Sequence, residues 1–71
     1  MYKVYIKTDE EGHITDINSS AFIEDAQCFI KIDEGYGDKF HHAQGNYLPH
    51  PLVKEDGSYR YVYAHGKIAE A

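Results

Sequence analysis

The stretch YKVYIKTDEEGHITDIN, residues 2–18, has the pattern of a β-hairpin and decides the fold class. Tyr2, Val4 and Ile6 alternate with other residues in its first half, so they share one face of a half-buried strand. An acidic turn follows and ends in Gly12, which tolerates a positive φ. The chain then returns as a second, weaker strand. We therefore expect a β-hairpin at the start of a mainly β protein.

The next segments predict a third strand after an interruption. QCFIKID, residues 27–33, alternates again and places Cys28 on one face as a buried or half-buried thiol. SSAFIEDA, residues 19–26, breaks the alternation, and we expect it to form a short helix or a loop. Its Phe22 is expected to plug the core.

The second half of the chain predicts one or two helical turns and then more strands. DKFHHAQG, residues 38–45, fits short helical turns with Asp38 as the N-cap. The next segment is extended, because each of its two prolines disfavours the helical region for the residue before it. Residues 52–70 contain two acidic or glycine turns between strands. We therefore predict one small, mainly β domain over residues 1–71, with about five strands in hairpins and one or two short helical turns.

A chain of 71 residues buries only about 60% of the surface that it exposes when unfolded. Domains of this size often rely on disulfides, a metal or a partner subunit. Cys28 is the only cysteine, so an internal disulfide is excluded, and the additional support is a metal, a partner or nothing.

The charge pattern excludes some partners. Seven Lys and Arg residues stand against twelve Asp and Glu residues, and the basic residues are scattered instead of forming a stripe. Nucleic-acid binding needs such a stripe, so we expect no nucleic-acid partner. No apolar run approaches the ~18 residues of a membrane span, and the N-terminus has no signal-peptide hydrophobic region. We expect no membrane contact, synthesis in the cytoplasm and, as one possibility, incorporation into a virion.

Three of the five histidines lie within residues 40–51. His41 and His42 are adjacent, so on a regular helix they point about 100° apart and are not expected to hold one ion together. His42 with His50, or His41 with Asp38 at i,i+3 spacing, are the candidate ligand pairs. The alternative is one packed and one exposed histidine without a metal.

The tyrosines suggest a binding surface. Tyr59, Tyr61 and Tyr63 share one face of a predicted strand, which is either core or an exposed strip for a subunit or a carbohydrate. Together with Tyr47 they are the predicted interaction surface. We predict no catalytic residues and no cofactor, because the sequence contains no GxSxG, HExxH, GxGxxG or P-loop motif.

Several stretches resemble a family of short, uncharacterised prophage proteins and tail-fibre-associated segments of Gram-positive gut bacteria. They are YIKTDEEGHIT, INSSAF, IDEGYGDKFHHAQGNYL and YRYV, and GDKFHHAQGNYL is the most specific part. The resemblance covers nearly the whole chain and implies a virion component or an accessory of tail-fibre or baseplate assembly, with no enzymatic activity. Relatives of this pattern continue past HGKI into a charged helical tail, whereas this chain ends at Ala71, so a function carried by such a tail is not expected here.

The leading hypothesis is a non-enzymatic, prophage-encoded structural or tail-associated interaction module. Its partner would be a second copy of the chain or a larger phage tail protein. The alternatives are a carbohydrate- or host-surface-binding module that uses the tyrosine strip, and a metal-binding module around Asp38, His41, His42 and His50.

Overall fold

The computed structural model describes all residues from 1 to 71 and contains a three-stranded antiparallel sheet. Its strands are β1 (Tyr2–Thr8), β2 (Ile14–Ser19) and β3 (Ile30–Gly35), in the order β2-β1-β3. The central strand β1 pairs on both sides, with Ile6 opposite Ile17 of β2 and Val4 opposite Asp33 of β3. The predicted hairpin of residues 2–18 is therefore confirmed.

The second sheet is a hairpin formed by β4 (Tyr61–Ala64) and β5 (Lys67–Glu70). Its two-residue turn, His65–Gly66, has positive φ at both positions, 54° and 74°, as a type I′ turn requires. The amide of Tyr63 donates to the carbonyl of Gly12 at 2.8 Å, which ties β4 to the β1–β2 turn. The two sheets are thus joined by backbone hydrogen bonding as well as by side chains.

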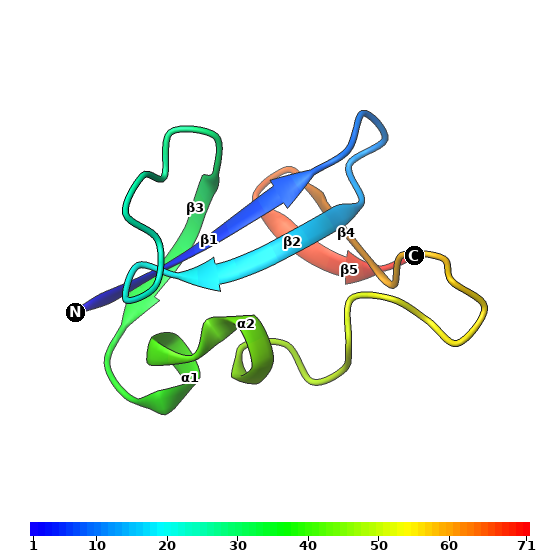
Figure 1. Cartoon of the computed structure of the whole chain (residues 1–71). Coiled ribbons are helices and arrows are strands. Elements are labelled where there is room, and N and C mark those ends of the chain that lie inside the picture. The colour runs from blue at the N-terminus through cyan, green and yellow to red at the C-terminus, as the bar shows by residue number, and fades with distance from the viewer.

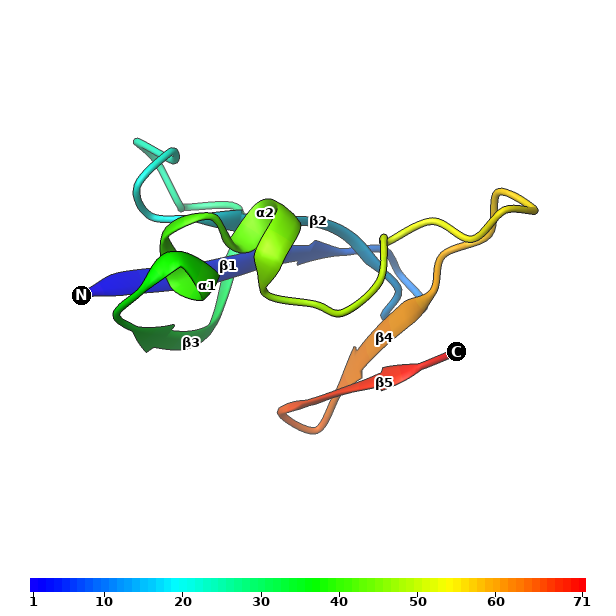
Figure 2. The ribbon, with the colours of Figure 1, turned by 90° about the horizontal axis from the view of Figure 1, so that it is seen from below.

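Two short helices lie on one face of the first sheet (Figures 1 and 2). They are α1 (Asp38–His41) and α2 (Ala43–Asn46), as the helical prediction required. The N-cap of α1 is Gly37, with φ 99°, so the prediction that Asp38 caps the helix is wrong: Asp38 is its first residue. At Gly35 the Phe40 ring approaches so closely that an added Cβ would lie 2.7 Å from it.

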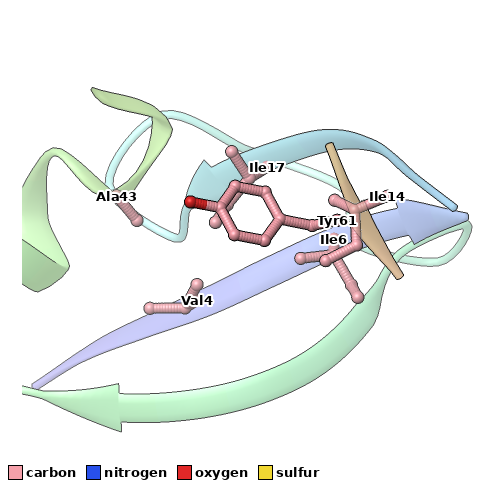
Figure 3. Close-up of a cluster of buried hydrophobic side chains, with 6 residues drawn as sticks. All are labelled: Val4, Ile6, Ile14, Ile17, Ala43 and Tyr61. Atoms are coloured by element: carbon pink, nitrogen blue, oxygen red, sulfur yellow. The ribbon is translucent and has the colours of Figure 1, made fainter. Parts of the chain in front are cut away.

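The core lies between the first sheet, α2 and β4 (Figure 3). Only seven of the 71 residues are buried, and six of them are apolar. Tyr61 reaches from β4 into the isoleucines of β1 and β2, and its hydroxyl points toward Ala43. The hydroxyl has no hydrogen-bond partner. The apolar core members are Val4, Ile6, Ile14, Ile17, Ala43 and Tyr61.

The segment between β2 and β3 differs from the prediction. It forms turns without a helix, and Phe22 is 52% exposed instead of plugging the core. The third strand starts at Ile30, so Cys28 precedes it and is exposed. Phe29 packs edge-on to Tyr5 on the sheet face away from the core cluster, since Val4 and Ile6 point to the other face. Phe22, Phe29 and Tyr5 lie outside the core cluster, which consists mainly of isoleucine and valine side chains.

The architecture is mainly β, with five strands in two antiparallel sheets and two short helices, as predicted. The chain termini lie toward opposite ends of the molecule in both views (Figures 1 and 2). None of the helices has the length and apolar character needed to cross a membrane.

Candidate functional site

The most concentrated group of metal-ligating side chains lies where α1 meets α2. Asp38 begins α1, His41 ends it, and His42 is the joint between the two helices. The backbone of His42 is not helical (φ −113°, ψ 50°), so the 100° rotation of a regular helix does not apply there. We call Asp38, His41 and His42 the His–Asp cluster.

The side chains of the His–Asp cluster converge. One ligand atom from each residue lies within 4.8 Å of those of the other two, and the two imidazole rings have centroids 4.3 Å apart. The expectation that the two adjacent imidazoles point apart does not hold for this backbone. His50 is not part of this group.

Hydrogen bonds orient Asp38 within the cluster. Its Oδ1 lies 2.7 Å from Nδ1 of His42, four residues later, and its Oδ2 accepts a hydrogen bond of 2.5 Å from Asn46 Nδ2. The side chain of Asp38 is exposed and that of His42 is half-buried, so this pair alone contributes little stability. Its main effect is to hold the carboxylate beside the imidazoles.

Aromatic rings surround the two histidines. The ring of Tyr2 stacks on His41 at 4.6 Å between centroids and 14° between planes, and Phe22 lies nearly parallel to His41 at 5.6 Å. The ring of Phe22 also lies beside that of His42, with 5.5 Å between the ring centroids. Tyr2 belongs to β1 and Phe22 to the loop after β2, so the cluster joins three separate parts of the chain.

A pocket of about 270 Å³ lies beside α2. Several of its lining residues follow the His–Asp cluster directly in the sequence, but no residue of the cluster lines it. Ala43 and Ile17 form its inner wall, and the proline-containing loop after α2 contributes Leu48, His50 and Leu52. The pocket is therefore mainly apolar, and His50 belongs to it and not to the metal-ligating group.

The four predicted surface tyrosines have different environments. Tyr61 is 4% exposed and belongs to the core, while Tyr47 and Tyr63 are half-buried and pack against it. Only Tyr59 is exposed, and its ring lies 6.1 Å from that of His13. A role of these residues in binding stays a prediction, and Tyr59 is the member that solvent reaches most.

A polar contact at the C-terminal end of α2 links this helix to the first sheet. The hydroxyl of Tyr47 donates a hydrogen bond of 2.7 Å to Asp33 of β3. This hydrogen bond lowers the pKa of Asp33, and the amide of Glu34 adds to the effect. Burial, and then the bond to Asp33, raise the pKa of Tyr47 to about 12. The pair lies outside the His–Asp cluster and is a structural link.

The sequence analysis did not identify Asn46, Tyr2 and Phe22 as neighbours of the histidines. One signal was available: Asp38, His42 and Asn46 follow each other at intervals of four residues, which places polar groups on one side of a helical segment. The contributions of Tyr2 and Phe22 depend on tertiary contacts, and local spacing does not reveal those.

No protein-family model, no curated protein and no solved structure matches this chain. The similarity to prophage proteins stays a prediction from the sequence.

Proposed function

We propose that the chain is a non-enzymatic protein-interaction module that receives an apolar side chain of its partner in the pocket beside α2. The observation that carries this proposal is the pocket itself: about 270 Å³, with Ile17, Ala43, Leu48 and Leu52 as its apolar walls. Pockets for drug-sized ligands start at about 300 Å³. A slightly smaller apolar pocket suits a single anchoring side chain, the usual centre of a protein interface.

The pocket is framed by rigid backbone. Pro49 and Pro51 line it, and their fixed φ limits the motion of the loop on that side. Ala43 on the opposite side belongs to the core, with 1% exposure. A pocket that is already formed saves the partner the cost of ordering it.

A second copy of the chain is the partner that we propose first. Seven buried residues make a small core, and a domain of this size gains stability from association. The chain also presents apolar side chains that fit such a pocket, and Tyr36, at 73% exposure, is the most exposed. The others are Met1, Phe22, Ile30, Val53 and Tyr59.

The biological context that we propose is a prophage-encoded structural or tail-associated protein, made in the cytoplasm and incorporated into a virion. This part rests on the sequence resemblance alone. Its most specific stretch, residues 37–48, contains α1 and α2 and includes four pocket residues, Ala43, Gln44, Gly45 and Leu48. In this context a larger phage tail protein is the alternative partner.

Light scattering at micromolar concentration, with a chelator present, tests the proposal. We expect a dimer or trimer for the natural chain. Gly45 lines the pocket, and an added Cβ there meets no atom within 4 Å, so Gly45→Glu introduces a charge at the pocket without a clash at the Cβ. We expect this variant to be a monomer.

The matched control is Gln27→Glu, which adds the same charge on an exposed loop outside the pocket and is expected to leave the mass unchanged. A monomeric natural chain would contradict self-association. In that case, retention on an immobilised phage tail protein, abolished by Gly45→Glu but not by Gln27→Glu, is the result expected for the alternative partner. An oligomer that is equally stable in both variants would show that the pocket is not the interface.

A further inference from the structure

We propose that Asp38, His41 and His42 together bind one divalent transition-metal ion of the zinc class. The proposal starts from the convergence of one ligand atom from each residue within 4.8 Å. It concerns a site separate from the pocket of the proposed function, because none of the three residues lines that pocket.

The donor set indicates the class of metal. Two imidazole nitrogens and one carboxylate oxygen suit Zn²⁺, Co²⁺ and Ni²⁺, whereas Ca²⁺ and Mg²⁺ require mainly oxygen ligands. Zinc holds nitrogen and oxygen ligands at about 2.0–2.2 Å, so three ligand atoms around one ion stand about 3.4 Å apart. In the structure the ligand atoms lie within 4.8 Å of one another, so binding of the ion has to draw them closer together.

The surroundings of the His–Asp cluster limit the motion of its ligands. Asn46 donates to Oδ2 of Asp38 at 2.5 Å and so positions the carboxylate. Tyr2 and Phe22 lie nearly parallel to the His41 ring and restrict its rotation. Contacts of this kind raise metal affinity because they orient the ligands before the ion arrives.

The exposure of the cluster determines how the coordination is completed. The side chain of Asp38 is 72% exposed and that of His42 is 44% exposed, so solvent reaches the ligands. Water therefore supplies the remaining positions around the ion. Because His41 also contacts Tyr2 of β1 and Phe22 of the loop after β2, the bound ion stabilises the folded chain.

Calorimetric titration of the full chain with Zn²⁺, supported by the absorption spectrum of Co²⁺, tests the site. We expect one ion per chain and a higher melting temperature in the presence of Zn²⁺. His41→Phe keeps an aromatic ring for the stacking contacts but removes the ligand, and His42→Gln keeps a donor for Asp38. Each variant is expected to bind at least about tenfold more weakly.

His50→Gln is the matched control, since His50 lies outside the cluster, and it is expected to bind Zn²⁺ like the natural chain. Asn46→Ala removes only the hydrogen bond to Asp38 Oδ2 and is expected to weaken binding by about tenfold. Circular dichroism without metal verifies that each variant is folded. If His41→Phe does not fold, Asp38→Asn at an exposed position provides the same test.

Two results would overturn the proposal. The first is an unchanged Zn²⁺ affinity in folded His41→Phe and His42→Gln. The second is an equal loss of affinity in His50→Gln, which would show that the ion binds histidines without selectivity.

Discussion

At the scale of single residues, the contact between Tyr47 and Asp33 links stability to pH on both the acid and the alkaline side. The Tyr47 hydroxyl holds the pKa of Asp33 below its ordinary value of 3.8, so the unfolded chain takes up this proton at a higher pH than the folded chain. The resulting stability is complete above the ordinary pKa and is lost as the pH falls through the lowered value. This contribution is therefore lost in acid.

Tyr47 acts in the opposite pH range. Burial, together with the bond to Asp33, raises its pKa from 10.0 to about 12, so the folded chain retains the proton longer than the unfolded chain. Its contribution to stability is complete below 10.0 and is lost as the pH rises toward 12.

We therefore expect Tyr47→Phe to reduce the pH dependence of unfolding at both ends. The measurement is the urea midpoint as a function of pH. Tyr36→Phe, at an exposed tyrosine outside this contact, is the control and should retain the profile of the natural chain. Identical pH profiles for Tyr47→Phe and the natural chain would show that the bond between Tyr47 and Asp33 is not formed in solution.

At the scale of elements, the turn between β4 and β5 depends on backbone conformation. Gly66 has a φ of 74°, and a side chain in this region costs about 1–2 kcal/mol. Gly66→Ala should therefore destabilise the chain by about 1 kcal/mol, measured by urea unfolding. Gly45 in α2 has no positive φ and has open space for a Cβ, so the same substitution there should stabilise the chain by about 0.5–1 kcal/mol.

The two substitutions are expected to change the free energy of unfolding in opposite directions, so each serves as a control for the other. Stabilisation by Gly66→Ala would mean that the type I′ turn is not the solution conformation. Destabilisation by Gly45→Ala would mean that α2 is not formed or that the pocket beside it is closed.

The elements also show how much of the fold can be predicted from the sequence. Alternation identified β1, because its buried residues Val4 and Ile6 recur with a period of two. The second strand was the weaker prediction, and the buried residues of β2, Ile14, Ile17 and Ser19, do not keep a strict period of two. Alternation also placed Cys28 in a strand as a buried or half-buried thiol, and hydrophobicity placed Phe22 of the interrupting segment in the core, but both are exposed. Those errors arise because hydrophobicity alone does not determine which apolar side chains are buried in a small core and which stay at the surface.

The candidate site was predicted in its residue types but not in its geometry. Asp38, His41 and His42 were among the candidates, yet a regular helix would separate the two histidines. The non-helical backbone at His42 removes that restriction, and no local sequence pattern predicts it. His50 illustrates the reverse: it is close in sequence and lies in a different environment.

At the scale of the whole molecule, we expect Tyr61 to couple the two small sheets into one cooperative unit. It belongs to β4 but is buried among Val4, Ile6, Ile14 and Ile17 of the first sheet (Figure 3). Removing a buried aromatic ring costs about 3–5 kcal/mol. At about 0.05–0.15 kcal/mol per residue, the total stability of such a chain is on the order of 4–11 kcal/mol. The ring of Tyr61 therefore accounts for a large share of the stability of both sheets.

We expect Tyr61→Ala to lower the protection of amides in β1, β2 and β4 together, as measured by hydrogen exchange. Tyr61→Phe is the matched control, because it keeps the ring and removes a buried hydroxyl that has no partner. This variant should be at least as stable as the natural chain, since an unsatisfied buried polar group costs about 1–3 kcal/mol. If β1 and β2 stay protected in Tyr61→Ala while β4 exchanges freely, the two sheets fold independently and the shared core does not couple them.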